Sequence, residues 1–505
     1  MMSRPEHLLG EKLDKLEEWQ RRGVNPYPYT WKRSHRSSEV VEQEAALTEK
    51  EVSIAGRLVT LRGHGKTSFA HVQDADGRMQ VYARRDDLGE EAYELWKLLE
   101  VGDIVGVTGV VFRTRTDELT VRVQSFELLS KSLRPLPDKW HGLSDKEVRY
   151  RQRYVDLIVS PEVRDVFFKR SQALSSMRQF LSAQGFLEVE TPVLQPLYGG
   201  ASARPFSTHH NALDFDFFLR IAPELYLKRL VVGGFDGVFE VARNFRNEGM
   251  DRSHNPEFTM MELYVAYWDY EDMMRLTEDM LRHVAQEVTG ATAVTFGDNE
   301  IDFGKPFARL PYMDALASKT GESLRDKDAD ALRAVAQANN VHVDADAPRG
   351  KILDDLFSEL VEHELIQPTF VTDYPKEISP LAKDHRSESG LVERFELFVS
   401  GMELANAFSE LNDPLEQRQR FEAQVALRAG GDLEAQPLDE DYLRALEYGM
   451  PPAGGLGMGV DRMVMLLTNS SSIRDVLLFP AMRPELGDAS PEASDEDAPQ
   501  PTSQG

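Results

Sequence analysis

One stretch of the chain concentrates side chains that bind phosphate and carboxylate groups. Phe239-Glu-Val-Ala-Arg-Asn-Phe-Arg-Asn-Glu248 leads through a polar loop, His254-Asn-Pro-Glu257, into the apolar run Phe258–Tyr264. This pattern predicts two strands around a loop dense in Arg, Asn, Glu and His. Arg246 stands at the apolar end of the first strand, where a buried guanidinium needs an anion. That anion is either a substrate or an internal partner such as Glu248.

A second segment has glycine at every second position. Gly455-Leu-Gly-Met-Gly-Val-Asp-Arg462 precedes the apolar helical run Met463–Leu467. Alternating glycines suit a strand that another backbone approaches closely. Arg462, at the strand-to-helix junction, is placed either to meet a phosphate or to form a structural ion pair.

The two common nucleotide-binding motifs of parallel-sheet folds are excluded. Gly63-His-Gly-Lys-Thr67 resembles the end of a P-loop, but Thr60 occupies the position of the required first glycine and a strand follows. No Gly-x-Gly-x-x-Gly segment opens a βαβ unit. An ATP site in this chain must therefore use a different fold.

The elements predicted around these segments mix helices and strands unevenly. A helix over 161–184 ends at Gly185 and leads into the apolar strand before Pro192. Further on, the pattern predicts strands near 217–222 and 237–241, a helix over 270–289, and strands over 394–399 and 402–411. A doubly wound parallel sheet would alternate strands and helices regularly. The fold class predicted is therefore α+β with an antiparallel sheet.

The N-terminal third has a different character. Helical patterns cover 4–23 and 38–47, and five β-like runs follow between 51 and 130, with a helix over 90–99 between the third and fourth. This order predicts an OB-fold β-barrel, a common oligonucleotide binder, although a barrel without a nucleic-acid role fits the pattern too. The predicted organisation is a helical extension over 1–50, the barrel over 51–132, a proline hinge over 133–155, a large α+β domain over 156–484 and a disordered acidic tail over 485–505.

Charge and composition limit the class of protein. The net charge is −27, so a nucleic-acid partner must be met by local basic groups, not by global attraction. The chain has no cysteine, which excludes disulfides and thiolate metal sites and fits a reducing compartment. No apolar run approaches the roughly 20 residues of a membrane span, and Met1–Glu11 lacks the apolar core of a secretory signal. A cytoplasmic protein without a membrane partner is expected.

Three segments together resemble motifs 1, 2 and 3 of the class II aminoacyl-tRNA synthetases, in the right order. They are Gly185–Leu194, Phe239–Tyr264 and Gly455–Leu467. The resemblance extends over roughly 5–484 and is closest to the lysyl-tRNA synthetases of subclass IIb. The finer match lies in Gly199–Phe206, His209–Leu213, Ile221–Arg229, Glu403–Asp413 and Ile473–Pro480.

The resemblance implies a lysine–tRNA ligase whose catalytic domain spans 156–484. Lysine and ATP would give lysyl-adenylate and pyrophosphate, and the lysine would pass to the 3′ end of tRNA(Lys). A carboxylate is already a nucleophile at pH 7, so this chemistry needs positioning and charge neutralisation. By resemblance, Arg246 would bridge the α-phosphate and the lysine carboxylate, and Arg462 would hold the γ-phosphate. The remaining ATP-binding residues would be Glu248, His254, Phe258, and the Mg²⁺ ligands Glu396 and Glu403.

The implied amino-acid pocket suits a substrate with two ammonium groups. Glu224 would bind the α-amino group, and Glu410, aided by Tyr264, would bind the ε-ammonium. An aspartyl or asparaginyl enzyme, the alternative within the subclass, would need a cation or an amide at position 410, because a buried Glu facing an acidic substrate is costly. The other pocket residues implied are Gly200, Arg246, Glu262, Asn406 and Phe408.

One detail of that pocket conflicts with an ideal strand. Asn406, Phe408 and Glu410 share a face by period-two alternation, whereas Glu403 points the other way. If Glu403 binds the same ATP-bound metal, a bulge or bend must lie between 403 and 406.

The resemblance also assigns the barrel to anticodon binding. Phe69 would stack on a base, and Arg62, Gln80 and Glu118 would read base edges. Taken alone, Phe69 would more often be a barrel-core aromatic. Arg149, Arg151 and Arg153 form a basic cluster that either touches tRNA or is a solvated helix face. Motif 1 implies a homodimer.

Two further alternatives keep the ancestry and change the activity. A paralogue that attaches lysine to a protein would lack the N-terminal barrel, which residues 51–130 supply. A non-catalytic RNA-binding or interaction protein would have lost Arg246, Arg462 or the acidic pair, all of which are present.

Overall fold

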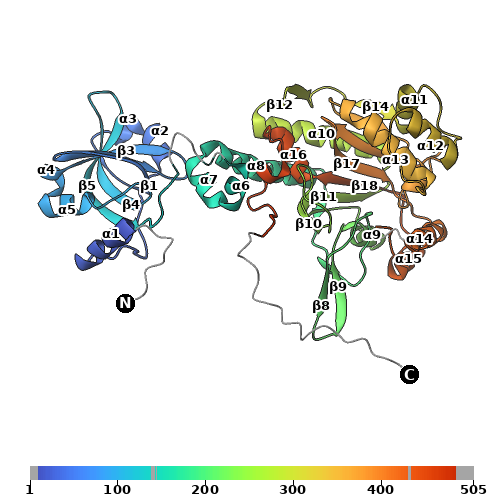
Figure 1. Cartoon of the computed structure of the whole chain (residues 1–505), viewed down its shortest axis with the longest axis horizontal. Coiled ribbons are helices and arrows are strands. Elements are labelled where there is room, and N and C mark those ends of the chain that lie inside the picture. Colours follow the sequence, from blue (N-terminus) through green and yellow to red (C-terminus); the bar gives the residue numbers. More distant parts are fainter. Residues whose placement is uncertain (1–9, 138–142, 144, 430–433, 485–505) are drawn as a thin grey trace. The chain divides into compact units, whose positions relative to one another are not determined.

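The computed structural model describes residues 10–137, 143, 145–429 and 434–484. The chain forms two compact units, Met1–Ser144 and Asp145–Gly505, and many of their elements are labelled in Figure 1. The predicted acidic tail, 485–505, and the first residues of the predicted helix over 4–23 lie outside the described residues. Each unit is described by itself.

The first unit is a closed five-stranded barrel with strand order β1-β2-β3-β5-β4. Its strands are β1 (Glu51–His64), β2 (Thr67–Gln73), β3 (Arg78–Arg84), β4 (Ile104–Arg113) and β5 (Leu119–Ser130). Two helices, α4 (Arg85–Leu88) and α5 (Glu90–Trp96), lie between β3 and β4 in the chain, where the OB-fold prediction required a helix. Three more precede the barrel: α1 (Gly10–Arg21), α2 (Ser37–Glu42) and α3 (Glu44–Leu47). The OB-fold prediction is confirmed.

The second unit is built on an eight-stranded sheet of order β14-β15-β16-β17-β18-β11-β10-β6. Neighbours are antiparallel except for β14–β15 and β10–β6, so the α+β prediction is confirmed. The strands are β6 (Leu187–Glu188), β10 (Gly237–Phe245), β11 (Glu257–Ala266), β14 (Ala308–Pro311), β15 (Thr369–Thr372), β16 (Arg394–Val399), β17 (Met402–Ser409) and β18 (Ala453–Gly459).

Period-two alternation gives this sheet one apolar face and one polar face. On β11, Met261 and Leu263 are fully buried and belong to the main core, whereas Met260 and Glu262 line a pocket. The core face is covered by α8 (Pro161–Ala183), α10 (Tyr270–Thr289) and α16 (Val460–Leu467), which contribute buried residues to the same cluster. The opposite face is left for polar side chains.

The remaining elements surround the sheet. They are α6 (Lys146–Arg151), α7 (Arg153–Val159), β7 (Leu194–Gln195), β8 (Ser207–His210), β9 (Phe215–Leu219), α9 (Glu224–Val232), β12 (Ala293–Phe296), β13 (Asn299–Asp302), α11 (Tyr312–Thr320), α12 (Ala329–Ala338), α13 (Arg349–Leu360), η1 (Glu362–Glu364), η2 (Lys376–Ile378), α14 (Pro414–Ala429), α15 (Glu440–Glu447) and α17 (Ile473–Val476). Helices α9 and α15 pack together in a separate core cluster, which also includes residues of β10, β11, α14 and β18.

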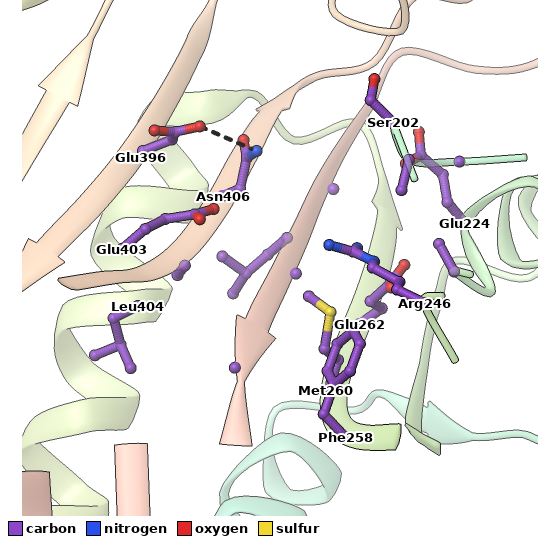
Figure 2. A pocket seen from close by; sticks show the side chains of 18 of the residues that line it. Ser202, Glu224, Arg246, Phe258, Met260, Glu262, Glu396, Glu403, Leu404 and Asn406 are labelled. Carbon is purple, nitrogen blue, oxygen red and sulfur yellow. Dashed lines mark hydrogen bonds between the residues drawn. The ribbon is translucent and has the colours of Figure 1, made fainter. Parts of the chain in front are cut away.

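The bulge required between 403 and 406 is present. The β16–β17 register runs Leu397↔Ala405 and then Phe398↔Glu403, so Leu404 is the extra residue. An extra residue reverses the direction of the side chains that precede it. In Figure 2, Glu403 lies on the same side as Asn406 and Glu396, and Leu404 points away. The bulge prediction is confirmed.

One local prediction was wrong. Arg149 and Arg151 each pair with an acid, and Arg153 belongs to neither a basic patch nor a solvated face, because it is 1% exposed and pairs with Asp156. The segment predicted as a hinge over 133–155 contains helix α6. Arg462 lies in the first turn of α16, which directly follows β18, so the predicted strand-to-helix junction is present there.

Candidate active site

A pocket of about 410 Å³ opens on the polar face of the sheet. Its walls come from β11, β16, β17 and β18, from the loop that follows β10, and from the N-terminus of α9. Figure 2 shows Glu396, Glu403 and Asn406 on one side and Arg246, Glu224 and Glu262 on the other. The pocket therefore has anionic side chains on two sides and a guanidinium between them.

The structure gathers nearly all of the predicted ATP and lysine residues at this pocket. Glu410 is the exception: it does not line the cavity directly and is buried at 1% exposure beneath Gly455. The predicted residues that line the cavity are Gly200, Glu224, Arg246, Glu248, His254, Phe258, Glu262, Tyr264, Glu396, Glu403, Asn406, Phe408 and Arg462.

Arg246 is fixed by its backbone while its side chain is left available. Its N–H donates to the carbonyl of Pro256 over 2.9 Å, which ties the two ends of the loop together. The guanidinium lies 5.1 Å from the ring centroid of Phe258. Its Nε is buried without a hydrogen-bond partner, and no ion pair with Glu248 occurs among the described residues. A buried donor without a partner is expected where an anionic substrate binds.

Arg462 connects the loop after β10 with strand β17. Its Nη1 donates to the carbonyl of Glu403 over 2.5 Å and lies 3.4 Å from the Glu403 carboxylate. Nη2 lies 3.4 Å from Nε2 of His254, whose Nδ1 is 2.8 Å from Asp251. Partial burial alone would raise the pKa of Asp251, but hydrogen bonds from His254 and Ser253 lower it to about 2. Asp251 is thus a permanent acceptor that orients His254 toward Arg462.

The acidic end of the pocket is held by residues that sequence reasoning did not single out. Arg394 donates from Nη2 to Glu396 over 2.6 Å and from Nε to Asn406 over 3.1 Å. Tyr374 donates its hydroxyl to the other Glu396 oxygen over 2.8 Å. Burial raises the pKa of Glu396 to about 7, against the pull of Arg394 and with the help of Glu403. Arg394 and Tyr374 therefore position Glu396.

The end of the pocket predicted to bind the amino acid, called the amino-acid end below, has three acidic side chains. Glu224, Glu262 and Glu410 are all buried. Tyr264 donates its hydroxyl to Glu262 over 3.3 Å, so in this structure it serves Glu262 and not Glu410 as predicted. Burial and the nearby Glu224 charge together raise the pKa of Glu262 to about 8, against the opposing effect of Arg246. Lys228, also missed by sequence reasoning, forms ion pairs with both Glu224 and Glu410.

One of the alternating glycines of β18, Gly455, is explained by these side chains. A Cβ on Gly455 would overlap Oε1 of Glu410 and come within 2.5 Å of Cε1 of Tyr264. Gly200, at φ +87°, approaches Glu224 in the same way, since a Cβ there would lie 2.8 Å from Glu224 Cβ. Both glycines leave space that the acidic side chains occupy.

Gly455→Ala is expected to damage the amino-acid end of the pocket and spare the rest. The added methyl must displace Glu410 or Tyr264, because β18 is a central strand whose backbone cannot move away. We expect the KM for the amino acid to rise at least about tenfold, with the KM for ATP within about twofold of the parent value. The matched control is Gly459→Ala, whose Cβ would meet only ordinary contacts at 3.7 Å. Equal losses in both variants would contradict the close-approach explanation.

The predicted anticodon residues lie on the outer surface of the barrel. Phe69 is 39% exposed and packs on Tyr82 with ring centroids 4.7 Å apart, so it is not a core aromatic. Arg62 is directly across from Phe69 in the β1–β2 ladder. Gln80 accepts from Thr120 over 2.8 Å, and Glu118 lies 3.2 Å from His71, which pairs with Gln80 across β2 and β3. His71 and Tyr82 lie directly across from Gln80 and Phe69, and the strand register could have identified them as neighbours of the predicted anticodon residues.

Protein ligands for a metal are few in the part of the chain that the structure describes. No group of three or more His, Asp or Glu side chains is arranged there to hold an ion. Glu396 and Glu403 share one side of the pocket, and carboxylate oxygens are the ligands that Mg²⁺ prefers. An ion bound by two carboxylates would complete its shell with phosphate oxygens and water.

Comparison with known proteins places this geometry in a family. The family profile described as tRNA synthetases class II (D, K and N) matches residues 145–483, and an OB-fold nucleic acid binding domain profile matches 52–129. The lysine–tRNA ligase of Carboxydothermus hydrogenoformans is 55% identical over 94% of this chain and 98% of its own length. The chain belongs to the lysine–tRNA ligase family. The ligases of Methanoculleus marisnigri (55% identical, 94% of each chain) and Staphylococcus epidermidis (53% identical, 94% of this chain and 97% of the relative) are similar.

Membership of the lysine–tRNA ligase family covers both units. The synthetase match includes every residue that lines the pocket, and the OB-fold match includes Arg62, Phe69, Gln80 and Glu118. Among the described residues, no helix combines the length and the apolar character needed to cross a bilayer.

Proposed function

We propose that this protein is a lysine–tRNA ligase that works in the cytoplasm, activating L-lysine with ATP and transferring it to the 3′ end of tRNA(Lys). The observation that carries the proposal is the buried acidic end of the pocket. Neither oxygen of Glu410 accepts a hydrogen bond of good geometry among the described residues, although Oε2 forms an ion pair with Lys228. A buried carboxylate with unused acceptor capacity suits a ligand group that donates hydrogen bonds, and an ammonium group also compensates its charge.

The pocket favours lysine over the acidic or amide substrates of the same subclass. Glu224, Glu262 and Glu410 would repel the side chain of aspartate. Lys228 does not offer a free cation to such a side chain, because Glu224 and Glu410 already pair with it. Glu224 binds the α-amino group in this proposal, Glu410 the ε-ammonium, and Glu262 and Tyr264 complete the wall. Asn406, Phe408 and the backbone near Gly200 shape the remaining space.

Activation needs two charges to be brought together. An oxygen of the lysine carboxylate attacks the α-phosphorus of ATP, a new carboxyl–phosphate bond forms, and the bond to pyrophosphate breaks. Arg246 contacts both the carboxylate and the α-phosphate and so offsets their repulsion. Arg462 holds the γ-phosphate, and Phe258 stacks on the adenine. Glu248 and His254 help to position the nucleotide.

The acidic pair beside the phosphates fits Mg²⁺. Glu396 and Glu403 would hold the ion, which when bound neutralises phosphate charge. Glu396 is already oriented by Arg394 and Tyr374. Without an ion, these two carboxylates would repel a polyphosphate.

The second step and the assembly follow from the same family. The 3′-terminal ribose hydroxyl of tRNA attacks the adenylate carbonyl, and AMP leaves. A homodimer is proposed from motif 1. Exposed apolar side chains on α8 and on or beside β6, β7 and β9 support it. They are Phe168, Leu187, Val193, Leu194 and Phe215.

Phe69→Ala is expected to impair the charging of tRNA and to leave the activation of lysine unchanged. The lost stacking platform lowers kcat/KM for charging tRNA(Lys) at least about tenfold, since one base–aromatic stack contributes about 1–3 kcal/mol. Lysine-dependent ATP–pyrophosphate exchange without tRNA should keep its parent rate. Charging is measured with parent and anticodon-altered tRNA(Lys) transcripts. If Phe69→Ala charges tRNA(Lys) normally, or if anticodon-altered tRNA is charged as well as the parent transcript, the barrel does not read the anticodon.

Lysine affinity is expected to rise from pH 6.5 to about 8. Because the pKa of Glu262 is about 8, this acid is neutral in the empty pocket at pH 7. A bound ammonium favours the carboxylate, so binding releases a proton, and the affinity increases by up to about tenfold per pH unit below the pKa. Calorimetry at pH 7 in two buffers of different ionisation enthalpy measures the released proton. Glu262→Gln should release none; proton release equal to the parent in that variant would assign it to another group.

A further inference from the structure

Lys228 is a cation buried at the amino-acid end of the pocket, and it has no role in the chemistry described above. It lies on α9, one turn after Glu224, and is fully buried. Its Nζ is 2.6 Å from Oε1 of Glu224 and forms a second ion pair with Oε2 of Glu410. A single ammonium therefore joins the two carboxylates that the proposed function assigns to the two ends of the substrate.

Aromatic rings and acidic groups surround the ammonium of Lys228. The rings of Tyr264 and Phe408 lie 5.8 and 5.4 Å from Nζ. Burial by itself lowers the pKa of Lys228, but Glu224 and Glu410 raise it above the ordinary lysine value. The titratable and charged groups that act on this cluster are Glu224, Glu262, Tyr264, Glu410, Tyr442, Glu240, Arg246 and Arg394.

When a diamine is bound and Glu262 has released its proton, the charges around the amino-acid end balance. Three buried carboxylates, Glu224, Glu262 and Glu410, stand against one resident cation. The α- and ε-ammonium groups of lysine supply the two missing positive charges, and Arg246 matches the substrate carboxylate. Burial raises the pKa of both Glu224 and Glu410, and Lys228 opposes that rise. Without Lys228, these acids would bind protons in the empty pocket.

We propose that Lys228 is a positioning residue that keeps Glu224 and Glu410 ionised and oriented in the empty pocket, so that lysine meets two ready carboxylates. The inference rests on the proposed function, because it assigns those carboxylates to the substrate. Lys228 acts through them and is not itself expected to touch the substrate. Its ammonium is shared between the carboxylates before lysine binds and completes the charge balance afterwards.

Lys228→Met tests the inference by calorimetric titration with lysine. At pH 7 the variant should bind lysine at least tenfold more weakly than the parent, with unchanged affinity for ATP. The gap should narrow as the pH rises toward 9, because the protons taken up by Glu224 and Glu410 are then lost to solvent. A role in packing alone would give a loss that does not depend on pH, and that result overturns the inference. Arg229→Met, which removes the next charge on α9 where it pairs with Asp439, should bind lysine like the parent.

A double variant keeps the test decisive if Lys228→Met fails to fold. Glu410→Gln/Lys228→Met removes both members of one buried pair and leaves Glu224 without its cation. Because Lys228 also keeps Glu224 ionised in this proposal, the double variant should bind lysine more weakly than Glu410→Gln alone at pH 7, and the difference should shrink toward pH 9. Equal binding by the two variants, or a difference that does not depend on pH, would overturn the inference. If the proposed function is wrong, the parent protein itself binds no lysine. That result separates failure of the proposed function from failure of the role assigned to Lys228.

Discussion

Arg246→Ala is expected to abolish lysine-dependent ATP–pyrophosphate exchange, with kcat reduced at least about 10³-fold. The attacking carboxylate and the α-phosphate are both anionic, and Arg246 is the guanidinium proposed to contact the two at once. Its Nε has no hydrogen-bond partner among the described residues, so the side chain is set aside for a ligand. The measurement is the exchange rate at saturating lysine and ATP.

Arg243→Ala is a matched control, because Arg243 lies on β10, the strand that directly precedes Arg246. Arg243 is three residues earlier on β10, is half exposed and does not line the pocket; its side chain contacts Thr259 and Glu257. Arg243→Ala should keep an exchange rate within about threefold of the parent. Near-normal exchange in Arg246→Ala, or an equal loss in both variants, would reject the role assigned to Arg246.

Glu410→Gln is expected to raise the KM for lysine by the equivalent of about 2–4 kcal/mol, because a buried substrate ammonium loses its charged partner. The substitution keeps the size of the side chain, so the pocket should keep its shape. The KM for ATP should stay within about twofold of the parent, since ATP binds at the other end of the pocket. Steady-state exchange kinetics with each substrate varied in turn provide the measurement.

Glu393→Gln controls for the loss of any buried acid near this strand. Glu393 is 3% exposed, and its partners Arg386 and Ser409 do not line the pocket. Glu393→Gln should lower stability and leave the KM for lysine unchanged. A lysine KM that rises as much as in Glu410→Gln would remove the case for a specific contact. An unchanged lysine KM in Glu410→Gln itself would count against the proposed pocket.

Much of the fold follows from local patterns in the sequence. The order of strands and one helix predicted the barrel, and the uneven mixture of helices and strands predicted the antiparallel sheet. The bulge at Leu404 was predicted from a conflict: Glu403 and Asn406 had to share a face that simple alternation denied them. Patterns of period two and residue chemistry were sufficient at these points.

The sequence was less informative where tertiary contacts decide the role of a charge. Lys228 reads as one more cation on a helix, and only the fold brings Glu410, almost two hundred residues later, against it. Arg153 reads as part of a basic surface, but its guanidinium is buried against Asp156 and the carbonyls of Arg474 and Leu478. Each residue has one partner within a helical turn, Asp156 or Glu224, but the partners that complete its burial come from distant segments, and residue spacing could not identify those.

The charge balance of the pocket is tested most directly by supplying all twenty amino acids, one at a time, in the ATP–pyrophosphate exchange assay. The account predicts exchange with L-lysine and background rates with aspartate and asparagine, because Glu224, Glu262 and Glu410 together accept a diamine and repel an acid. Exchange driven by aspartate or asparagine instead of lysine would contradict it.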